Sequence, residues 1–309
     1  MKKVLLIFLT RCLLMTFAGC RKEDKKEGKT NIVVTIYPVY DWVREIIKDD
    51  PNYEITLLQD SGTDLHNYQP TVSDMAELSK SDIFIYVGGE SDEWVEDALE
   101  TVTNKDMKVI NLMKVLSERV LEEEVKEGME EEEHDHEDHE EPENDEHIWL
   151  SLKNAEICVN AIYDAIDDAS LKNNQEAYLN KLNELDEEYE KALVSSGKVL
   201  LFADRFPFLY LFKDYGLDYY AAFVGCSSEV EASFETVKFL AEKTDELKLK
   251  YVMILENGNR KLAETVIANS RSKSREVREL DSLQSATLDC DSYLDIMQKN
   301  LEVLKKVIN

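Results

Sequence analysis

The sequence is poor in basic residues and, beyond its first twenty positions, has no long apolar run. It carries 36 Lys and Arg against 65 Asp and Glu, which gives a formal net charge of −29. Nucleic-acid binding needs clustered Lys and Arg to neutralise phosphates, so this balance argues against nucleic acid as a partner and favours cations. No later segment approaches the roughly 20 apolar residues of a transmembrane helix, which predicts a soluble body.

Cysteine is also scarce, and its spacing argues against two common uses. Three cysteines follow the first twenty residues: Cys158, Cys226 and Cys290. An odd number cannot all pair within one molecule, and the sequence leaves open whether Cys226 and Cys290 form a disulfide. Because none lies in a C-x-x-C pair, thiolate zinc sites and redox motifs are not expected. Cys158 stands in an apolar pattern that is typical of a core residue.

The N-terminal segment has the layout of a secretory signal. Two lysines precede an apolar run, and a small Ala-Gly pair stands directly before Cys20, which resembles the lipobox of bacterial lipoproteins. Residues 1–19 are therefore expected to be a signal peptide, with Cys20 lipidated and anchored at the outer face of the cell membrane. Arg11 interrupts the apolar core, so the alternative is a short uncleaved anchor. Residues 20–30 are expected to form a flexible tether.

Short β-rich runs alternate with helical patterns through the rest of the chain. The runs lie at 31–36, 53–58, 82–87 and 108–112, and then at 198–202, 218–222, 251–255 and 276–280. This alternation predicts an α/β fold with two lobes, each a parallel sheet flanked by helices.

Two stretches between these sets, 152–169 and 173–195, carry apolar residues at helical spacing. We therefore expect an N-terminal lobe at 31–170, one long linker helix at 171–196 and a C-terminal lobe at 197–309. A continuous helix resists bending, so the lobes should close little on a ligand.

Residues 121–146 differ from the rest because they are nearly all Glu, Asp and His. Such a segment cannot bury enough apolar surface to fold, which predicts a mobile loop. It contains His134, His136 and His139, an auxiliary set that could bind zinc weakly and feed a main site, or only raise the local cation concentration. The alternative is a solvated charge run.

The two remaining histidines stand where the sequence predicts order. His66 follows a predicted strand within a polar turn, and α/β sheets bind their ligands beyond the carboxyl ends of strands. His147 stands where the acidic segment gives way to an ordered apolar one. Imidazole is the commonest ligand for zinc, so both are candidate metal ligands. Alternatively, His66 is an ordinary surface or core residue, and His147 only continues the His-rich tract.

Three carboxylates of the second lobe occupy corresponding places after predicted strands. They are Asp204, Glu256 and Asp281. Each is a candidate oxygen ligand, although carboxylates are also common as caps in polar turns.

The sequence resembles the metal-binding lipoproteins, or solute-binding proteins, of zinc and manganese ABC importers. The matching stretches run in family order at 33–41, 64–70, 84–89, 147–150, 214–217 and 280–283. The resemblance implies two α/β lobes joined by one long helix, with the metal site between the lobes. It also implies His66 and His147 as ligands from the first lobe and Asp281 as the carboxylate ligand from the second.

One customary ligand of that family is missing here. A histidine in zinc binders, or a glutamate in manganese binders, precedes an aromatic pair; in this chain Ala203 or Arg205 stands at that place. Asp204 is the nearest substitute, and Arg205 could instead pair with a carboxylate near the site. The third ligand is left open, with water or a loop histidine as further possibilities.

The resemblance implies a monomeric carrier that is not an enzyme, which binds a divalent metal and delivers it to the permease of an ABC importer. Two imidazoles and a carboxylate suit zinc, although manganese is possible. The alternatives are an exported zinc-dependent hydrolase and a surface adhesion or interaction protein with a structural metal. The sequence lacks the H-E-x-x-H helix of many zinc hydrolases.

Overall fold

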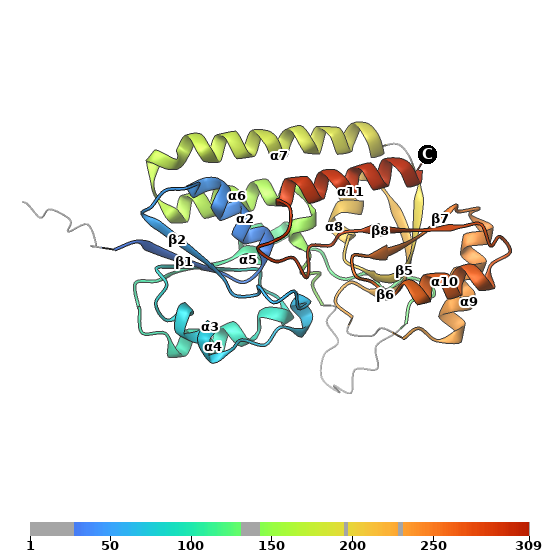
Figure 1. The fold of residues 1–309 in the computed structure, drawn as a ribbon, viewed down its shortest axis with the longest axis horizontal. Helices are drawn as coiled ribbons and strands as arrows, with labels where there is room; N and C mark the ends of the chain where they lie inside the picture. The colour runs from blue at the N-terminus through green and yellow to red at the C-terminus, as the bar shows by residue number, and fades with distance from the viewer. Residues whose placement is uncertain (1–27, 131–142, 195–196, 228–230, 309) are drawn as a thin grey trace, which may run out of the picture.

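Two parallel sheets lie side by side beneath a shared layer of long helices (Figure 1). The computed structural model describes residues 28–130, 143–194, 197–227 and 231–308. The expected signal peptide, Cys20 and most of the tether lie outside these residues. Within the described part of the chain, no helix is both long and apolar enough to cross a membrane.

The first sheet has the strand order β2-β1-β3-β4, and every pairing in it is parallel. Its strands are β1 (Thr30–Val34), β2 (Tyr53–Leu57), β3 (Ile83–Tyr86) and β4 (Lys108–Asn111). The four residues of β3 are all buried, as expected of a strand covered on both faces. One face packs against α2 (Tyr37–Ile47), α5 (Leu112–Leu116) and α6 (Leu152–Ile166), and the other against α3 (Val72–Leu78) and α4 (Trp94–Thr101).

The second sheet repeats this plan with the order β6-β5-β7-β8, again parallel throughout. Its strands are β5 (Val199–Phe206), β6 (Asp218–Val224), β7 (Tyr251–Leu255) and β8 (Glu276–Leu280). One face packs against α9 (Phe234–Glu246) and α10 (Arg260–Asn269), and α8 (Leu209–Tyr215) belongs to the core on the other. All eight predicted strands and the two-lobed α/β fold are thus confirmed.

The linker helix α7 (Lys172–Leu193) runs above the first lobe toward the second, and the C-terminal helix α11 (Tyr293–Ile308) runs from the junction of the lobes over the second (Figure 1). The hydroxyl of Tyr189 in α7 donates to the carbonyl of Met297 in α11 at 2.7 Å. A single apolar core joins α2 and α6 of the first lobe through α7 to strands of the second. The long connecting helix is therefore present as predicted, and it is packed along its length. Cys158 lies in this core, and all three described cysteines are free.

The acidic segment departs from the expected loop at both of its described ends. Residues 121–130, which we call the strap, cross from the first lobe to the second: the backbone N–H of Glu130 donates to the carbonyl of Ala222 in β6 at 2.9 Å. The Met129 side chain is buried, and Glu122 pairs with Asn144 as an antiparallel bridge. The auxiliary residues His134, His136 and His139 lie outside the described residues.

Candidate metal centre

His66 lies in a short 3-10 turn (Leu65–Asn67) beyond the carboxyl end of β2. The turn is fixed by Asp64, whose Oδ1 accepts the backbone N–H of His66 at 3.1 Å. The imidazole Nδ1 lies 2.9 Å from the hydroxyl oxygen of Ser91. These contacts at the backbone and at Nδ1 hold the ring with its Nε2 directed at the second histidine.

His147 directly precedes a second 3-10 turn (Ile148–Leu150) and is fully buried. One oxygen of Asp145 lies 2.8 Å from the backbone nitrogen of His147 and 3.0 Å from its Nδ1. The same carboxyl oxygen therefore contacts both the backbone and the ring of His147 and fixes the orientation of the imidazole. Burial lowers the pKa of His147 to about 4, which keeps the ring neutral.

The two lobes bring four polar side chains together at one point. The Nε2 atoms of His66 and His147 are 3.2 Å apart, close to the edge of about 3.3 Å between two nitrogens in a tetrahedral zinc site. Ligand atoms of Cys226, His66 and His147 all lie within 4.8 Å of one another. Nε2 of Gln284 lies 3.0 Å from Nε2 of His66 and 2.6 Å from Nε2 of His147.

Cys226 is a candidate ligand that the sequence did not indicate, because the fold places its thiol beside the two histidines. It lies two residues after the end of β6, which is the same kind of position, just beyond a strand, as that of the candidate carboxylates. A C-x-x-C pattern could not indicate this thiol, because the fold and not the neighbouring sequence brings it to the histidines. Among the described residues, this is the single group of three His, Cys, Asp or Glu side chains close enough to hold a metal ion.

The three candidate carboxylates lie outside that group and contact the protein backbone. The oxygens of Asp204 accept the backbone N–H groups of Arg205 at 2.9 Å and Leu255 at 3.1 Å. Both oxygens of Glu256 accept hydrogen bonds from Ser282, each at 2.6 Å.

The third carboxylate, Asp281, accepts the backbone N–H of Leu283 at 2.8 Å. Burial raises the pKa of Glu256 to about 8, and the neighbouring Asp281 carboxyl adds to this. The three carboxylates therefore organise the loops that carry the site.

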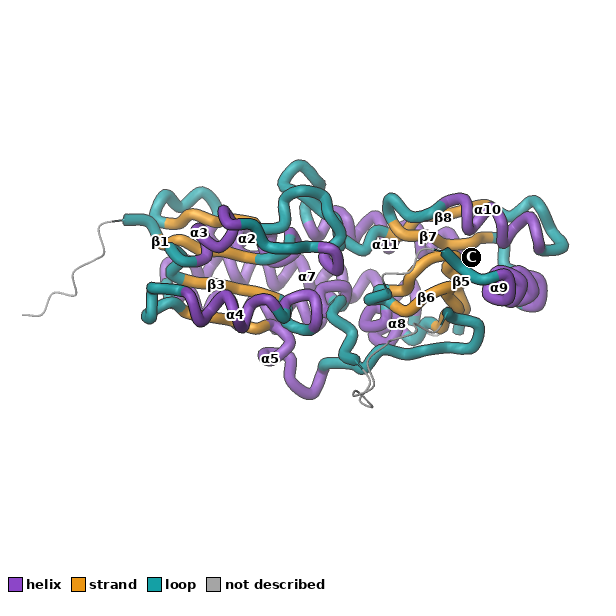
Figure 2. The backbone as a smooth tube through the Cα atoms, turned by 90° about the horizontal axis from the view of Figure 1, so that it is seen from below, coloured by secondary structure: helices purple, strands orange, loops and turns teal. Residues whose placement is uncertain are grey.

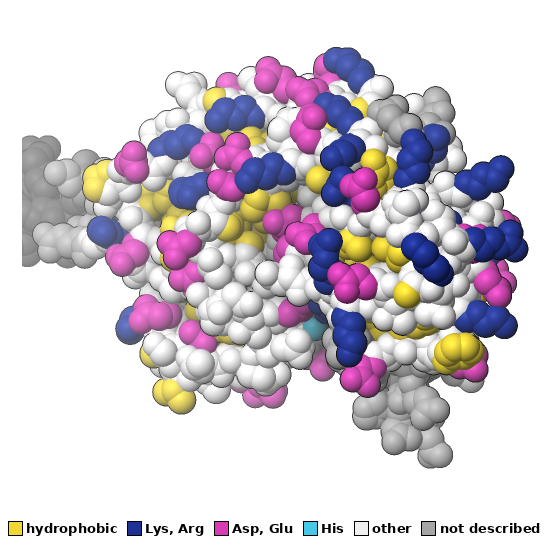
Figure 3. Space-filling view, turned by 45° about the vertical axis from the view of Figure 1, so that its right-hand side comes forward, with side chains coloured by type: hydrophobic (Ala, Val, Ile, Leu, Met, Phe, Trp, Pro, Cys, Tyr) yellow, Lys and Arg dark blue, Asp and Glu magenta, His cyan; other side chains and the backbone are white. Residues whose placement is uncertain are grey.

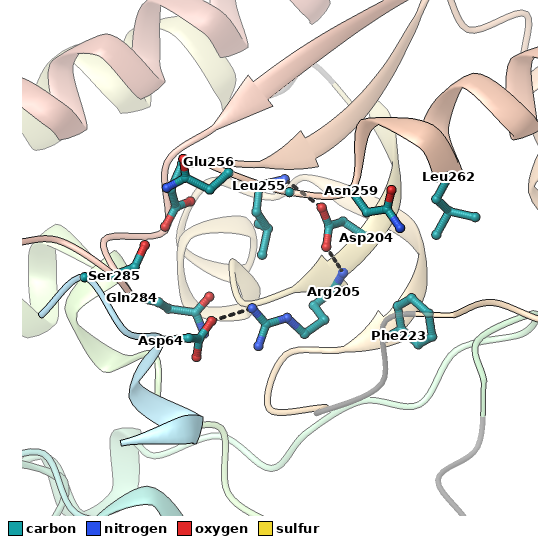
Figure 4. Close-up of a pocket in the computed structure, with 13 residues that line it drawn as sticks. Asp64, Asp204, Arg205, Phe223, Leu255, Glu256, Asn259, Leu262, Gln284 and Ser285 are labelled. Atoms are coloured by element: carbon teal, nitrogen blue, oxygen red, sulfur yellow. Dashed lines mark hydrogen bonds and ion pairs between the residues drawn. The ribbon is translucent and has the colours of Figure 1, made fainter. Parts of the chain in front are cut away.

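Arg205 forms an ion pair across the lobes, as the sequence suggested for it. Its guanidinium lies 2.5 Å from Oδ2 of Asp64, the residue that fixes the His66 turn. Both side chains line a cavity of about 430 Å³ together with Asp204, Glu256 and Gln284 (Figure 4). On the face drawn in Figure 3, acidic and basic side chains are interspersed. The tube view in Figure 2 shows the two sheets end to end, with the loops of the site between them.

Comparison with known proteins places this arrangement in a family. Zinc-binding lipoprotein AdcA of Streptococcus pneumoniae is 32% identical over 317 residues, covering 99% of this chain and 61% of AdcA, so the chain spans about three fifths of that relative. High-affinity zinc uptake system protein ZnuA of Bacillus subtilis is 28% identical over 313 residues, covering 97% of this chain and 96% of that protein.

The Zn(II)-bound ZnuA-like domain of S. pneumoniae AdcA superposes with a TM-score of 0.71 at 28% identity, covering 91% of this chain and 99% of the domain. The matching family model is described as zinc-uptake complex component A, periplasmic, and covers residues 32–307. It describes a transport component and not an enzyme. The chain thus belongs to the ZnuA family.

Proposed function

We propose that this protein is an extracytoplasmic carrier that binds one divalent transition metal ion between its lobes, zinc in preference to manganese, and passes it to the permease of an ABC importer. Family membership and the zinc-binding relatives support the cargo and the transport role. In this proposal Cys20 carries the lipid anchor, and the carrier acts as a monomer.

The observation that carries the proposal is the convergence of His66, His147 and Cys226 from both lobes. We assign these three as ligands, in place of the carboxylates Asp204, Glu256 and Asp281. Two imidazoles and a thiolate form a soft donor set that suits zinc, whereas manganese prefers oxygen. The thiolate strengthens the preference for zinc that the histidines alone suggest.

The first experiment is calorimetric titration of the metal-stripped protein with zinc and with manganese. We expect one tight zinc site and much weaker manganese binding. His66→Ala should abolish the tight site, because it removes one of the two imidazole ligands. Deleting residues 131–141 is the control and should leave the zinc affinity nearly unchanged. If the intact protein shows no tight one-to-one site for either metal, the proposal is wrong.

Cys226→Ser tests the thiolate separately. Loss of a partner that only supports a ligand costs 10- to 100-fold in metal affinity, so loss of the ligand itself should weaken zinc binding by roughly 100-fold or more. The cadmium-loaded protein should show an ultraviolet sulfur-to-metal absorption band that this variant lacks. Cys158→Ser, in the core and away from the site, should keep the band.

A further inference from the structure

The turn that carries His66 has little support from the core of its own lobe. Residues 60–64, which lead from β2 to this turn, are all exposed or half-buried. The carboxylate of Asp64 connects the segment in two directions: Oδ1 accepts the backbone N–H of His66 at 3.1 Å, and Oδ2 accepts a hydrogen bond from the Arg205 guanidinium at 2.5 Å. One carboxyl group therefore joins a metal ligand of the first lobe to a side chain of the second (Figure 4).

A register shift in β5 sets where Arg205 points. The parallel pairing of β5 with β6 is irregular between Phe202 and Arg205. A bulge of this kind bends the strand and changes the direction of the side chain beside it. Asp204 holds the irregular backbone in place, because its two oxygens accept the N–H groups of Arg205 at 2.9 Å and of Leu255 in β7 at 3.1 Å. The second sheet thus supplies Arg205 from a fixed backbone position.

The guanidinium of Arg205 has a further contact beside another proposed ligand. Its NH1 lies 3.4 Å from the carbonyl oxygen of Ser227, the residue after Cys226. Arginine suits this place because its charge is permanent and its donors form a planar fork that can reach two acceptors. The side chains of Arg205 and Asp64 are only 16% and 20% exposed, so salt screens their ion pair less than one on the surface. The guanidinium therefore spans the gap between the His66 turn and the Cys226 segment.

We propose that Arg205 is a positioning residue that holds the His66 turn against the Cys226 segment and so places the ligands of both lobes before the metal arrives. The proposal rests on the proposed function and deepens it. A site that is held ready in this way binds more tightly, because less conformational freedom is lost on binding. Arg205 itself has only donors and no lone pair for a metal, so it acts through the residues that it contacts.

The test has to keep the net charge of the centre, because the charge of Arg205 by itself would repel a bound cation. Arg205→Met combined with Asp64→Asn, which we call the neutral-pair variant, removes one positive and one negative charge. An amide oxygen can still accept the backbone N–H of His66, so the local turn is kept while the link between the lobes is lost. The matched control is Arg260→Met with Glu279→Gln, which removes an exposed ion pair of the second lobe in the same way.

Zinc affinity is measured by competition with a chelator, and zinc release by stopped-flow transfer to that chelator. The neutral-pair variant should bind zinc roughly 10- to 100-fold more weakly, the usual cost of losing a partner of a metal ligand, and should release it faster. The control variant should match the intact protein in both measurements. Arg205→Lys keeps a cation that can pair with Asp64, so it should bind zinc more tightly than the neutral-pair variant.

Amide hydrogen exchange of the metal-free protein gives a measurement that does not depend on zinc. In the neutral-pair variant the N–H of His66 should exchange faster than in the intact protein, whereas the N–H groups of β3 should keep their protection. Loss of protection in β3 as well would indicate a general loss of structure and contradict the positioning role. Zinc affinity equal to that of the control variant would also show the role to be wrong. In both cases the intact protein still binds zinc, whereas failure of the proposed function would appear as no tight zinc site in the intact protein.

Discussion

Asp92 is a buried carboxyl group whose charge is unfavourable at neutral pH. Its Oδ2 accepts the backbone N–H of Gly88 at 2.9 Å. Burial raises its pKa from an ordinary 3.8 to about 6, and the hydrogen bond from Gly88 only partly offsets this. Between these two pH values the folded protein holds a proton that the unfolded chain has lost, so stability falls as the pH rises. Above about pH 6 the full cost, roughly 3 kcal/mol, is present.

Asp92→Asn should therefore stabilise the protein at pH 7 and have much less effect at pH 4. The amide oxygen can still accept the N–H of Gly88, so the local turn is kept. Urea unfolding of both proteins at the two pH values measures the difference. Asp97→Asn removes the same charge from an exposed position on α4 and should change stability little at either pH. Equal effects of Asp92→Asn at the two pH values would contradict the explanation.

Residue chemistry could be predicted from the sequence only where the residue type itself marks a ligand. His66 and His147 were found because imidazole is a common ligand and both stand at the edges of ordered segments. Cys226 also stands just beyond a strand end, but without a C-x-x-C pair its sequence context does not indicate a metal ligand.

The strap shows, at the scale of one element, how a highly acidic segment can still be ordered. Composition predicted a loop for residues 121–146 because few apolar side chains are present. Lys126 pairs with Asp218, and Glu130 accepts the backbone N–H of Ser233 at 2.5 Å, so the second lobe supplies the partners. Contacts of this kind join residues about one hundred positions apart, which no local pattern reveals.

Gly128 packs closely against the second lobe, so a substitution there tests whether the strap packs on that lobe. Its φ of 88° is unfavourable for other residues, and a Cβ there would overlap the Phe239 ring of α9. Gly128→Ala should lower the free energy of unfolding by roughly 1–2 kcal/mol, because alanine is unfavourable in a left-handed backbone. It should lower it further because the Phe239 ring must move. Gly216→Ala is the matched control, because its φ is 67° and nothing lies within 4 Å. Thermal unfolding should show the larger loss for Gly128→Ala; equal losses would mean that the strap does not pack on Phe239.

At the scale of the whole molecule, one apolar core runs through both lobes. This core determines whether folding depends on metal binding. The buried faces of α7 and α11 join that core. We expect such packing to restrict the hinge motion between the lobes and to let the protein fold without a metal ion. Zinc binds the folded form in this arrangement, so it adds stability by mass action.

Chelation of the metal should therefore leave the far-ultraviolet circular dichroism of the protein unchanged while its Tm falls. At free zinc 100 times the Kd, binding adds about 2.7 kcal/mol. For a protein of this size, that stabilisation corresponds to a rise in Tm of roughly 5 °C. The rise should increase with the logarithm of zinc concentration and disappear in His66→Ala, which lacks the site but keeps the core. If the metal is structural instead, chelation alone would unfold both lobes at room temperature. That outcome would contradict the carrier function and favour an interaction protein that needs its metal to fold.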